Sequence, residues 1–84
     1  MRNFVVNIRL SKAAGRALSR SDKRVLLRQK IAELAGEPLS QSANVKKLRG
    51  RPGYRLRVQD WRIIFRIEDN VLWIDEIGPR GSVY

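Results

Sequence analysis

Two hydrophobic periods divide this chain, and the change from one to the other constrains its fold more than any other feature. Within residues 11–36 apolar side chains recur at the spacing of an amphipathic helix. Between residues 54 and 77 apolar and polar side chains alternate instead, which is the spacing of β-strands with one buried face. The sequence therefore predicts a helical part followed by a sheet, an arrangement of the α+β class.

Capping and turn residues set the boundaries of these elements. Ser11 and the Ser19–Asp22 segment are helix starts, and Gly36 followed by Pro38 is a helix stop. The expected elements are a strand over 4–9, helices over 11–18 and 19–36, and strands over 45–48, 54–58, 61–67 and 71–77. This order, β-α-α-β-β-β-β, predicts a small antiparallel β-sheet with an N-terminal helical hairpin packed on one face.

Length and composition limit the classes of protein. The 84 residues, 43% of them hydrophobic, suffice for one small domain spanning residues 1–84. No apolar run has the length of a membrane span and the first residues lack a signal peptide's apolar stretch, so we expect a cytoplasmic protein without a membrane partner. The chain has no cysteine and no histidine, and we expect no metal and no cofactor.

The net charge indicates the chemistry of a partner. Eighteen lysines and arginines stand against eight acidic residues, which gives a formal charge of +10. A field this positive favours association with polyanions, and nucleic acid is the first candidate. A merely soluble basic domain is the alternative.

Arginines on one face of the two middle strands form the candidate site. Because side chains alternate across a strand, Arg55 and Arg57 must point away from the apolar face, and Arg62 and Arg66 share their side on the next strand. The helices cover the apolar face, so no remaining element is expected to cover these arginines. Like charges at cross-strand distance repel each other, which favours a site for an anion; a solvated sheet face is the alternative.

Two further segments extend this basic face. Gly78 and Pro79 are expected to end the last strand, which leaves Arg80 and Tyr84 on a loop or tail that is free to fold over the arginines. Without histidine or cysteine, guanidinium groups and a phenol supply nearly all the available chemistry, and such a set suits a phosphodiester. Four basic residues before the arginine strands could contact an RNA backbone or lie in a solvated turn: Lys46, Lys47, Arg49 and Arg51.

Four segments, in this order, resemble the RelE/ParE toxins of bacterial toxin–antitoxin modules: Lys47–Gly50, Tyr54–Arg57, Trp61–Phe65, and Ile77–Arg80 with Val83–Tyr84. The resemblance covers nearly the whole chain, because the order of strand, helical hairpin and sheet also matches. It implies a toxin that is neutralised by a cognate antitoxin protein, which wraps an amphipathic segment over it.

The activity that the resemblance implies depends on the branch. RelE toxins are metal-independent endoribonucleases that cut mRNA in the ribosomal A site, which makes the ribosome and mRNA the implied partners. ParE toxins share the fold but inhibit DNA gyrase, are not enzymes, and are not expected to keep the full set of RelE residues. The presence of the RelE residues in this chain favours the ribonuclease. A third alternative is a relative of these toxins that binds nucleic acid without cutting it. The matching positions are Arg55, Arg57, Arg62, Arg80 and Tyr84.

The implied reaction is attack of a ribose 2′-OH on the adjacent phosphate, which leaves a 2′,3′-cyclic phosphate and a 5′-OH. Arg62 and Arg80 are expected to bind the phosphate and Tyr84 to orient the substrate. The best-known members have lysines where this chain has Arg55 and Arg57, and arginine does not give up its proton. The general base is therefore open between Glu76, Tyr84 and the RNA or ribosome. If Glu76 faces Arg62, we expect it instead to be the ion-pair partner of that arginine.

Overall fold

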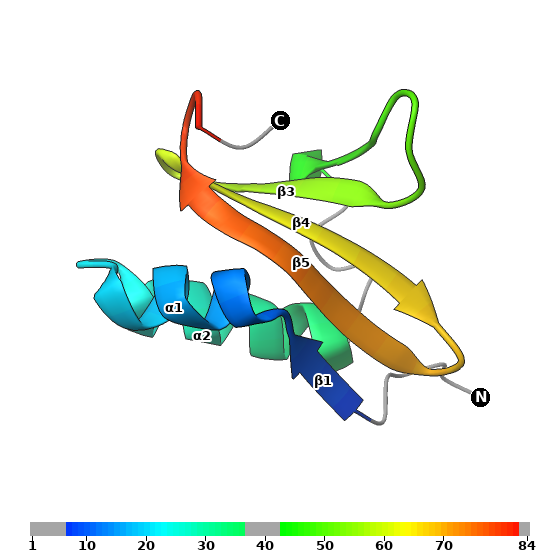
Figure 1. Ribbon diagram of the computed structural model, residues 1–84, viewed down its shortest axis with the longest axis horizontal. Coiled ribbons are helices and arrows are strands. Elements are labelled where there is room, and N and C mark those ends of the chain that lie inside the picture. Colours follow the sequence, from blue (N-terminus) through cyan, green and yellow to red (C-terminus); the bar gives the residue numbers. More distant parts are fainter. Residues whose placement is uncertain (1–6, 37–42, 83–84) are drawn as a thin grey trace.

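The computed structural model describes residues 7–36 and 43–82 (Figure 1). The elements, in chain order, are β1 (Asn7–Leu10), α1 (Lys12–Arg20), α2 (Arg24–Gly36), β2 (Val45–Lys47), β3 (Tyr54–Val58), β4 (Trp61–Glu68) and β5 (Val71–Pro79). This confirms the predicted α+β class and element order. The first predicted strand residues, 4–6, and the predicted stop at Pro38 lie outside the described residues.

The five strands form one mixed sheet in the order β1-β5-β4-β3-β2. The pairs β2–β3, β3–β4 and β4–β5 are antiparallel, as short connections between consecutive strands require, whereas β1 pairs with β5 in parallel. The prediction of an entirely antiparallel sheet is therefore wrong for β1. β1 is parallel to its neighbour because the chain continues from β1 into helices and not into a hairpin, so no tight turn fixes the direction of β1.

Ser11 joins the helical part to the sheet. Its hydroxyl accepts a hydrogen bond from the Ala14 backbone N–H at 3.0 Å, which caps α1 as predicted. The same hydroxyl donates to the Asp75 carbonyl at 2.8 Å, and the Ser11 N–H donates to the Ile74 carbonyl at 2.9 Å. The start of α1 is therefore fixed against the middle of β5.

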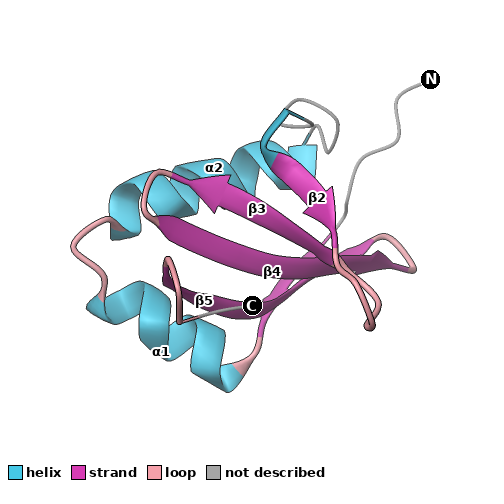
Figure 2. Ribbon diagram, turned by 90° about the horizontal axis from the view of Figure 1, so that it is seen from above, coloured by secondary structure: helices cyan, strands magenta, loops and turns pink. Residues whose placement is uncertain are grey.

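Both helices cover one face of the sheet, with α1 near β5 and α2 extending toward β3 (Figures 1 and 2). Buried side chains of the helices and strands form one core between these layers, as the two hydrophobic periods predict. Its members are Ala14, Leu18, Leu27, Ile31, Leu34, Ala35, Leu56, Val58, Ile63, Phe65, Leu72, Ile74 and Ile77.

The loop between β2 and β3, residues 48–53, covers part of the opposite face. Leu48 and Ile64 are both buried there and form a second, smaller cluster. Gly53 lies so close to β4 that a Cβ at this position would stand 2.9 Å from the Phe65 carbonyl oxygen. The prediction that no element covers this face is therefore wrong. The physical reason is Ile64, an apolar side chain at an outward position, which the loop buries.

Strand β5 contains a bulge and runs further than predicted. Ile64 pairs with Glu76 and Phe65 with Ile74, so Asp75 is an extra residue in β5. Gly78 and Pro79 still pair with β4, opposite Arg62 and Trp61, so they do not end sheet pairing as predicted. Proline is tolerated at this last strand position, where its missing N–H does not interrupt a continuing ladder.

Candidate functional site

Four guanidinium groups gather at one end of the face opposite the helices. Arg57 and Arg62 are direct cross-strand partners on β3 and β4, and Arg55 lies two residues before Arg57 on the same side of β3. Arg80 follows β5, and its N–H donates to the Asp60 carbonyl at 2.6 Å, which holds it beside the β3–β4 turn. We call Arg55, Arg57, Arg62 and Arg80 the arginine cluster.

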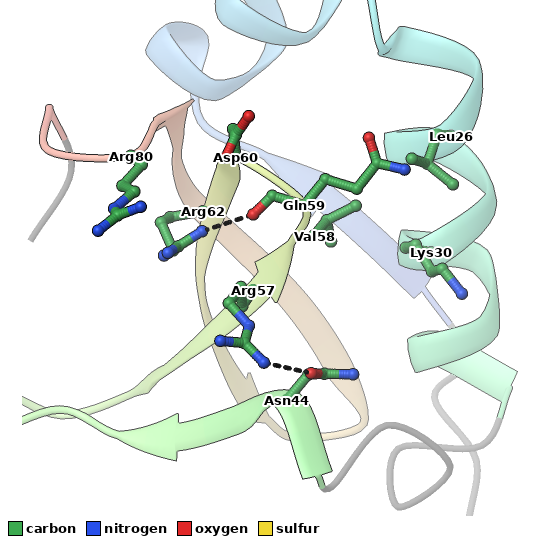
Figure 3. A pocket seen from close by; sticks show the side chains of 9 residues that line it. All are labelled: Leu26, Lys30, Asn44, Arg57, Val58, Gln59, Asp60, Arg62 and Arg80. Atoms are coloured by element: carbon green, nitrogen blue, oxygen red, sulfur yellow. Dashed lines mark hydrogen bonds between the residues drawn. The ribbon is translucent and has the colours of Figure 1, made fainter.

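Backbone and amide oxygens orient the two central members (Figure 3). Arg62 donates from Nη1 to the carbonyls of Gln59 at 3.0 Å and of Trp61 at 2.9 Å. Arg57 donates from Nη2 to the Asn44 side-chain oxygen at 3.4 Å. None of these acceptors carries a formal charge, so the bonds position the guanidinium groups without neutralising them.

Burial and mutual repulsion both act on the positive charges of the cluster. Partial burial lowers the pKa of Arg62, and the positive charges of Arg55, Arg57 and Arg80 lower it further, while Asp60 has the opposite effect. Within residues 7–36 and 43–82, no ion pair within 4.0 Å joins any member of the cluster to an acidic side chain. Apart from the smaller opposing effect of Asp60, the described residues therefore leave this mutual repulsion uncompensated.

Three members of the cluster, Arg57, Arg62 and Arg80, border a depression of about 530 Å³ that extends past the β3–β4 turn to α2. Arg57, Arg62 and Arg80 lie on one side of it, and side chains of α2 lie on the other (Figure 3). Its nine lining residues are Leu26, Lys30, Asn44, Arg57, Val58, Gln59, Asp60, Arg62 and Arg80. A neighbouring hollow of about 310 Å³ brings Lys46 and Arg55 next to Arg57 and Arg62.

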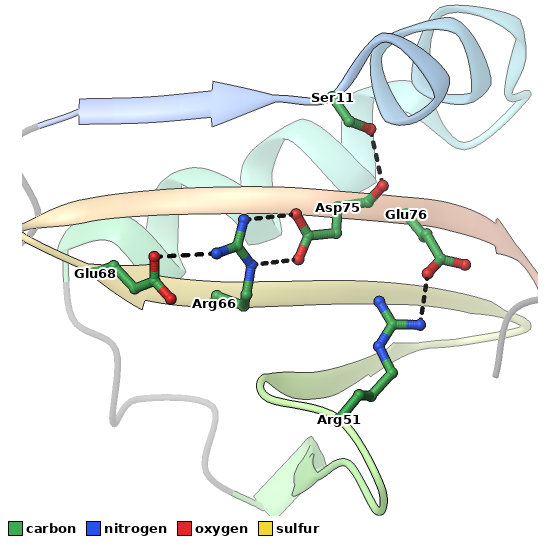
Figure 4. Close-up of polar contacts among 6 residues, drawn as sticks. All are labelled: Ser11, Arg51, Arg66, Glu68, Asp75 and Glu76. Atoms are coloured by element: carbon green, nitrogen blue, oxygen red, sulfur yellow. Dashed lines mark hydrogen bonds and ion pairs between the residues drawn. The ribbon is translucent and has the colours of Figure 1, made fainter.

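Arg66 lies on the predicted face but outside the cluster (Figure 4). Its Nε and Nη2 donate to the two carboxylate oxygens of Asp75 at 2.7 and 3.2 Å, and its Nη1 lies 3.0 Å from Glu68. The Asp75 bonds above all raise the pKa of Arg66 above its ordinary value. The expectation of uncompensated charge on this face is wrong for Arg66, because the bulge turns the Asp75 carboxylate toward it.

The remaining predicted residues occupy different surroundings. Arg51 pairs with Glu76 at 2.9 Å (Figure 4), so the predicted pairing of Glu76 with Arg62 is wrong. The exposed residues Lys46, Lys47 and Arg49 line a hollow with Arg55, which extends the basic surface along β2. Tyr84 lies outside the described residues. No group of three or more acidic side chains that could hold a metal ion occurs in the described part of the chain.

Among the lining residues of the depression that sequence reasoning did not place at the site are Leu26, Asn44, Val58, Gln59 and Asp60. Gln59 and Asp60 had a local signal, since they form the turn between the two arginine-bearing strands. Leu26 and Asn44 come from segments whose approach to β3 depends on the packing of α2, and no local sequence pattern predicts this packing.

Solved structures of RelE–RelB complexes and of YafQ have a similar fold. The archaeal RelE–RelB complex from Pyrococcus horikoshii OT3 matches at a TM-score of 0.75 and 27% identity, over 92% of this chain and 97% of that chain. The intact Escherichia coli RelBE toxin–antitoxin complex matches at 0.71 and 22%, over 95% and 100%. Escherichia coli YafQ matches at 0.73 and 17%, over 92% and 96%.

The family model of the ParE toxin of the type II toxin–antitoxin system parDE matches residues 8–84. The chain therefore belongs to this toxin family, and the resemblance to the RelE/ParE superfamily is confirmed. No curated protein matches the sequence. Among the described residues, no helix is both long and apolar enough to span a membrane.

Proposed function

We propose that this toxin is a ribosome-dependent endoribonuclease that cuts mRNA and so stops translation. The observation that supports this activity is the arginine cluster: three of its guanidinium groups border one depression, the fourth borders the neighbouring hollow, and no described carboxylate forms an ion pair with them. A phosphodiester is the ligand whose charge and geometry match such a set.

The chemistry required of the protein is largely electrostatic. Attack of the 2′-OH on phosphorus produces a phosphorane with additional negative charge on its oxygens, and fixed cations at that point lower the barrier. Arg62 suits this role because two backbone carbonyls orient its guanidinium before substrate arrives. Arg80 suits it because its backbone is tied to the β3–β4 turn, next to Arg62. Arg55 and Arg57 add charge along the path of the RNA backbone.

The proton acceptor for the 2′-OH has two candidates in this chain. Arginine keeps its proton, so Arg55 and Arg57 do not serve. Glu76 pairs with Arg51 and does not line the depression. Asp60 is the one described carboxylate that lines the depression. Tyr84, whose role rests on the family resemblance, is the other candidate.

Two macromolecular partners follow from this function. The ribosome would meet the basic surface that runs from the arginine cluster along Lys46, Lys47 and Arg49 on β2 and the start of its loop. A cognate antitoxin is the second partner, as in the RelE–RelB complexes that share the fold. An acidic antitoxin segment over the cluster would neutralise both its charge and its access to RNA.

Inhibition of DNA gyrase is the alternative function. The observation that favours it is the family match itself, because the matching model is described as the ParE toxin. In that case the basic surface would bind a protein or its DNA, and no bond would be cut.

A cell-free translation reaction with one defined mRNA, run beside a gyrase supercoiling assay, separates the two. We expect wild type to stop translation and fragment the mRNA, and Arg62→Ala to do neither. The matched control is Arg28→Ala, which removes an exposed arginine of α2 outside the depression and should behave as wild type. Inhibited supercoiling with intact mRNA would refute the ribonuclease.

A further inference from the structure

The depression beside the arginine cluster is larger than a phosphate group requires. Its volume of about 530 Å³ falls within the range of about 300–1,000 Å³ that is typical of sites for small organic ligands. The cationic residues Arg57, Arg62 and Arg80 occupy one side of it (Figure 3). A phosphate bound there would leave the side toward α2 unfilled.

The side toward α2 has a different chemistry. Leu26 on α2 and the buried Val58 at the end of β3 provide apolar surface. Gln59 extends its side chain from the β3–β4 turn toward Leu26, so its amide lies over this part of the depression (Figure 3). Lys30 also lines it and is paired with Glu33 at 3.4 Å.

Gln59 also has an unusual backbone conformation. Its φ of 54° lies in the left-handed region, which few non-glycine residues adopt. Its carbonyl accepts the hydrogen bond from Arg62 at 3.0 Å. One residue therefore orients a phosphate-binding guanidinium with its backbone while its side chain points to the apolar side.

We infer that the α2 side of the depression binds the nucleobase attached to the phosphate in the arginine cluster, with Gln59 as the residue that contacts the base edge. A base needs apolar contact for its ring faces and donors or acceptors for its edge, and a side-chain amide offers both kinds of hydrogen bond. Base and phosphate are joined through one sugar, which fits two sides of a single depression. The inference rests on the proposed function in one respect, that the anion is a nucleic-acid phosphate.

The test compares ligands that differ only in the base. The probes are the four nucleoside 5′-monophosphates and ribose 5-phosphate, titrated into the full chain by calorimetry. We expect at least one nucleotide to bind about fivefold or more tighter than ribose 5-phosphate, the gain from about 1 kcal/mol of base contact. Equal affinities for all five probes, or no binding of any, would overturn the inference.

Three variants test which residues cause a nucleotide to bind tighter than ribose 5-phosphate. Gln59→Gly removes the amide and accepts the positive φ, so it should abolish the preference for a base and leave ribose 5-phosphate binding unchanged. Arg80→Ala should weaken all five probes by a similar factor. Gln29→Ala, which removes an exposed amide of α2 outside the depression, should change nothing. A Gln59→Gly protein that keeps the full preference for a base would contradict the assignment.

Failure of the nuclease is distinguishable from failure of this inference. If wild-type protein binds a nucleotide in preference to ribose 5-phosphate but leaves mRNA intact on ribosomes, the base site is supported and the proposed ribonuclease activity is refuted. A glutamate-rich peptide that binds tighter than every nucleotide and loses its affinity in Gln59→Gly would show a peptide site instead, and would overturn the base site.

Discussion

Arg57 and Arg62 stand directly opposite each other on β3 and β4, and each is held by an uncharged oxygen acceptor instead of a carboxylate. Like charges in this position destabilise a sheet by a few tenths of a kcal/mol up to about 1 kcal/mol per pair. The arrangement weakens the fold, and under the proposed function a bound phosphate would relieve the repulsion that the described residues leave uncompensated.

Arg57→Gln should therefore stabilise the protein in the absence of ligand, by about 0.5 kcal/mol at low salt. Salt screens exposed charges, so the gain should shrink as the salt concentration rises. Urea unfolding at two salt concentrations measures it. Arg28→Gln on α2 is the control and should show no comparable gain. A destabilised Arg57→Gln protein at low salt would mean that the repulsion is already relieved in some other way.

The Arg66–Asp75 pair should contribute more to stability than the neighbouring Arg66–Glu68 pair. Asp75 accepts two hydrogen bonds and its side chain is 23% exposed, whereas the Glu68 side chain is 55% exposed. We expect Asp75→Asn to cost about 1–2 kcal/mol and Glu68→Gln less than about 0.5 kcal/mol. Equal losses of unfolding free energy in Asp75→Asn and Glu68→Gln, measured by urea unfolding, would show that the bulge does not depend on this bidentate contact.

The contribution of this pair should not change between about pH 7 and pH 10. The folded pKa of Arg66 lies above its ordinary value, so the stabilisation is present below the ordinary value and is lost only as the pH rises through the folded pKa. The difference in unfolding free energy between wild type and Asp75→Asn should stay constant between about pH 7 and pH 10. A difference that disappears within that interval would contradict this account of Arg66.

Gly53 and Gly50 form a matched pair in the loop that covers Ile64. Gly53 has a φ of +114° and no room for a Cβ beside the Phe65 carbonyl, whereas Gly50 has a φ of +77° and open space around it. Gly53→Ala should cost about 2–3 kcal/mol, and Gly50→Ala about 1 kcal/mol from backbone strain alone. Thermal unfolding of both variants checks the order; a Gly53→Ala protein as stable as Gly50→Ala would disprove the close approach.

Glu76→Gln should retain mRNA cleavage within about twofold of wild type, because Glu76 pairs with Arg51 away from the depression. Asp60→Asn is the comparison, since Asp60 lines the depression. Cleavage rates on programmed ribosomes measure both. A rate that falls by orders of magnitude in Glu76→Gln alone would make Glu76 the general base.

Alternation along the strands was enough to predict where the arginines point. Tyr54, Leu56 and Val58 share one face of β3, so Arg55 and Arg57 had to lie on the other, and the same logic placed Arg62. The cap at Ser11 was equally local, because a serine before an apolar helix satisfies a free backbone N–H.

Features that depend on distant contacts could not be predicted in this way. The bulge at Asp75 interrupts the alternation, which is why the partners of Arg66 and Glu76 were unexpected. The loop over Ile64 and the approach of Leu26 to Val58 are set by packing between segments far apart in the sequence. Arg80 lies on a loop after β5, one of the two predicted settings, but the backbone bond to Asp60 that fixes it there is not a local feature of the sequence.

The most direct test of the proposed function is mRNA cleavage on programmed ribosomes, mapped by primer extension, for wild type and Arg80→Ala. The account predicts cuts at the A-site codon with wild type and their loss with Arg80→Ala, while both proteins unfold at similar temperatures, because Arg80 is exposed and its backbone bond to Asp60 remains possible. Intact mRNA with wild-type protein that still arrests growth would contradict it.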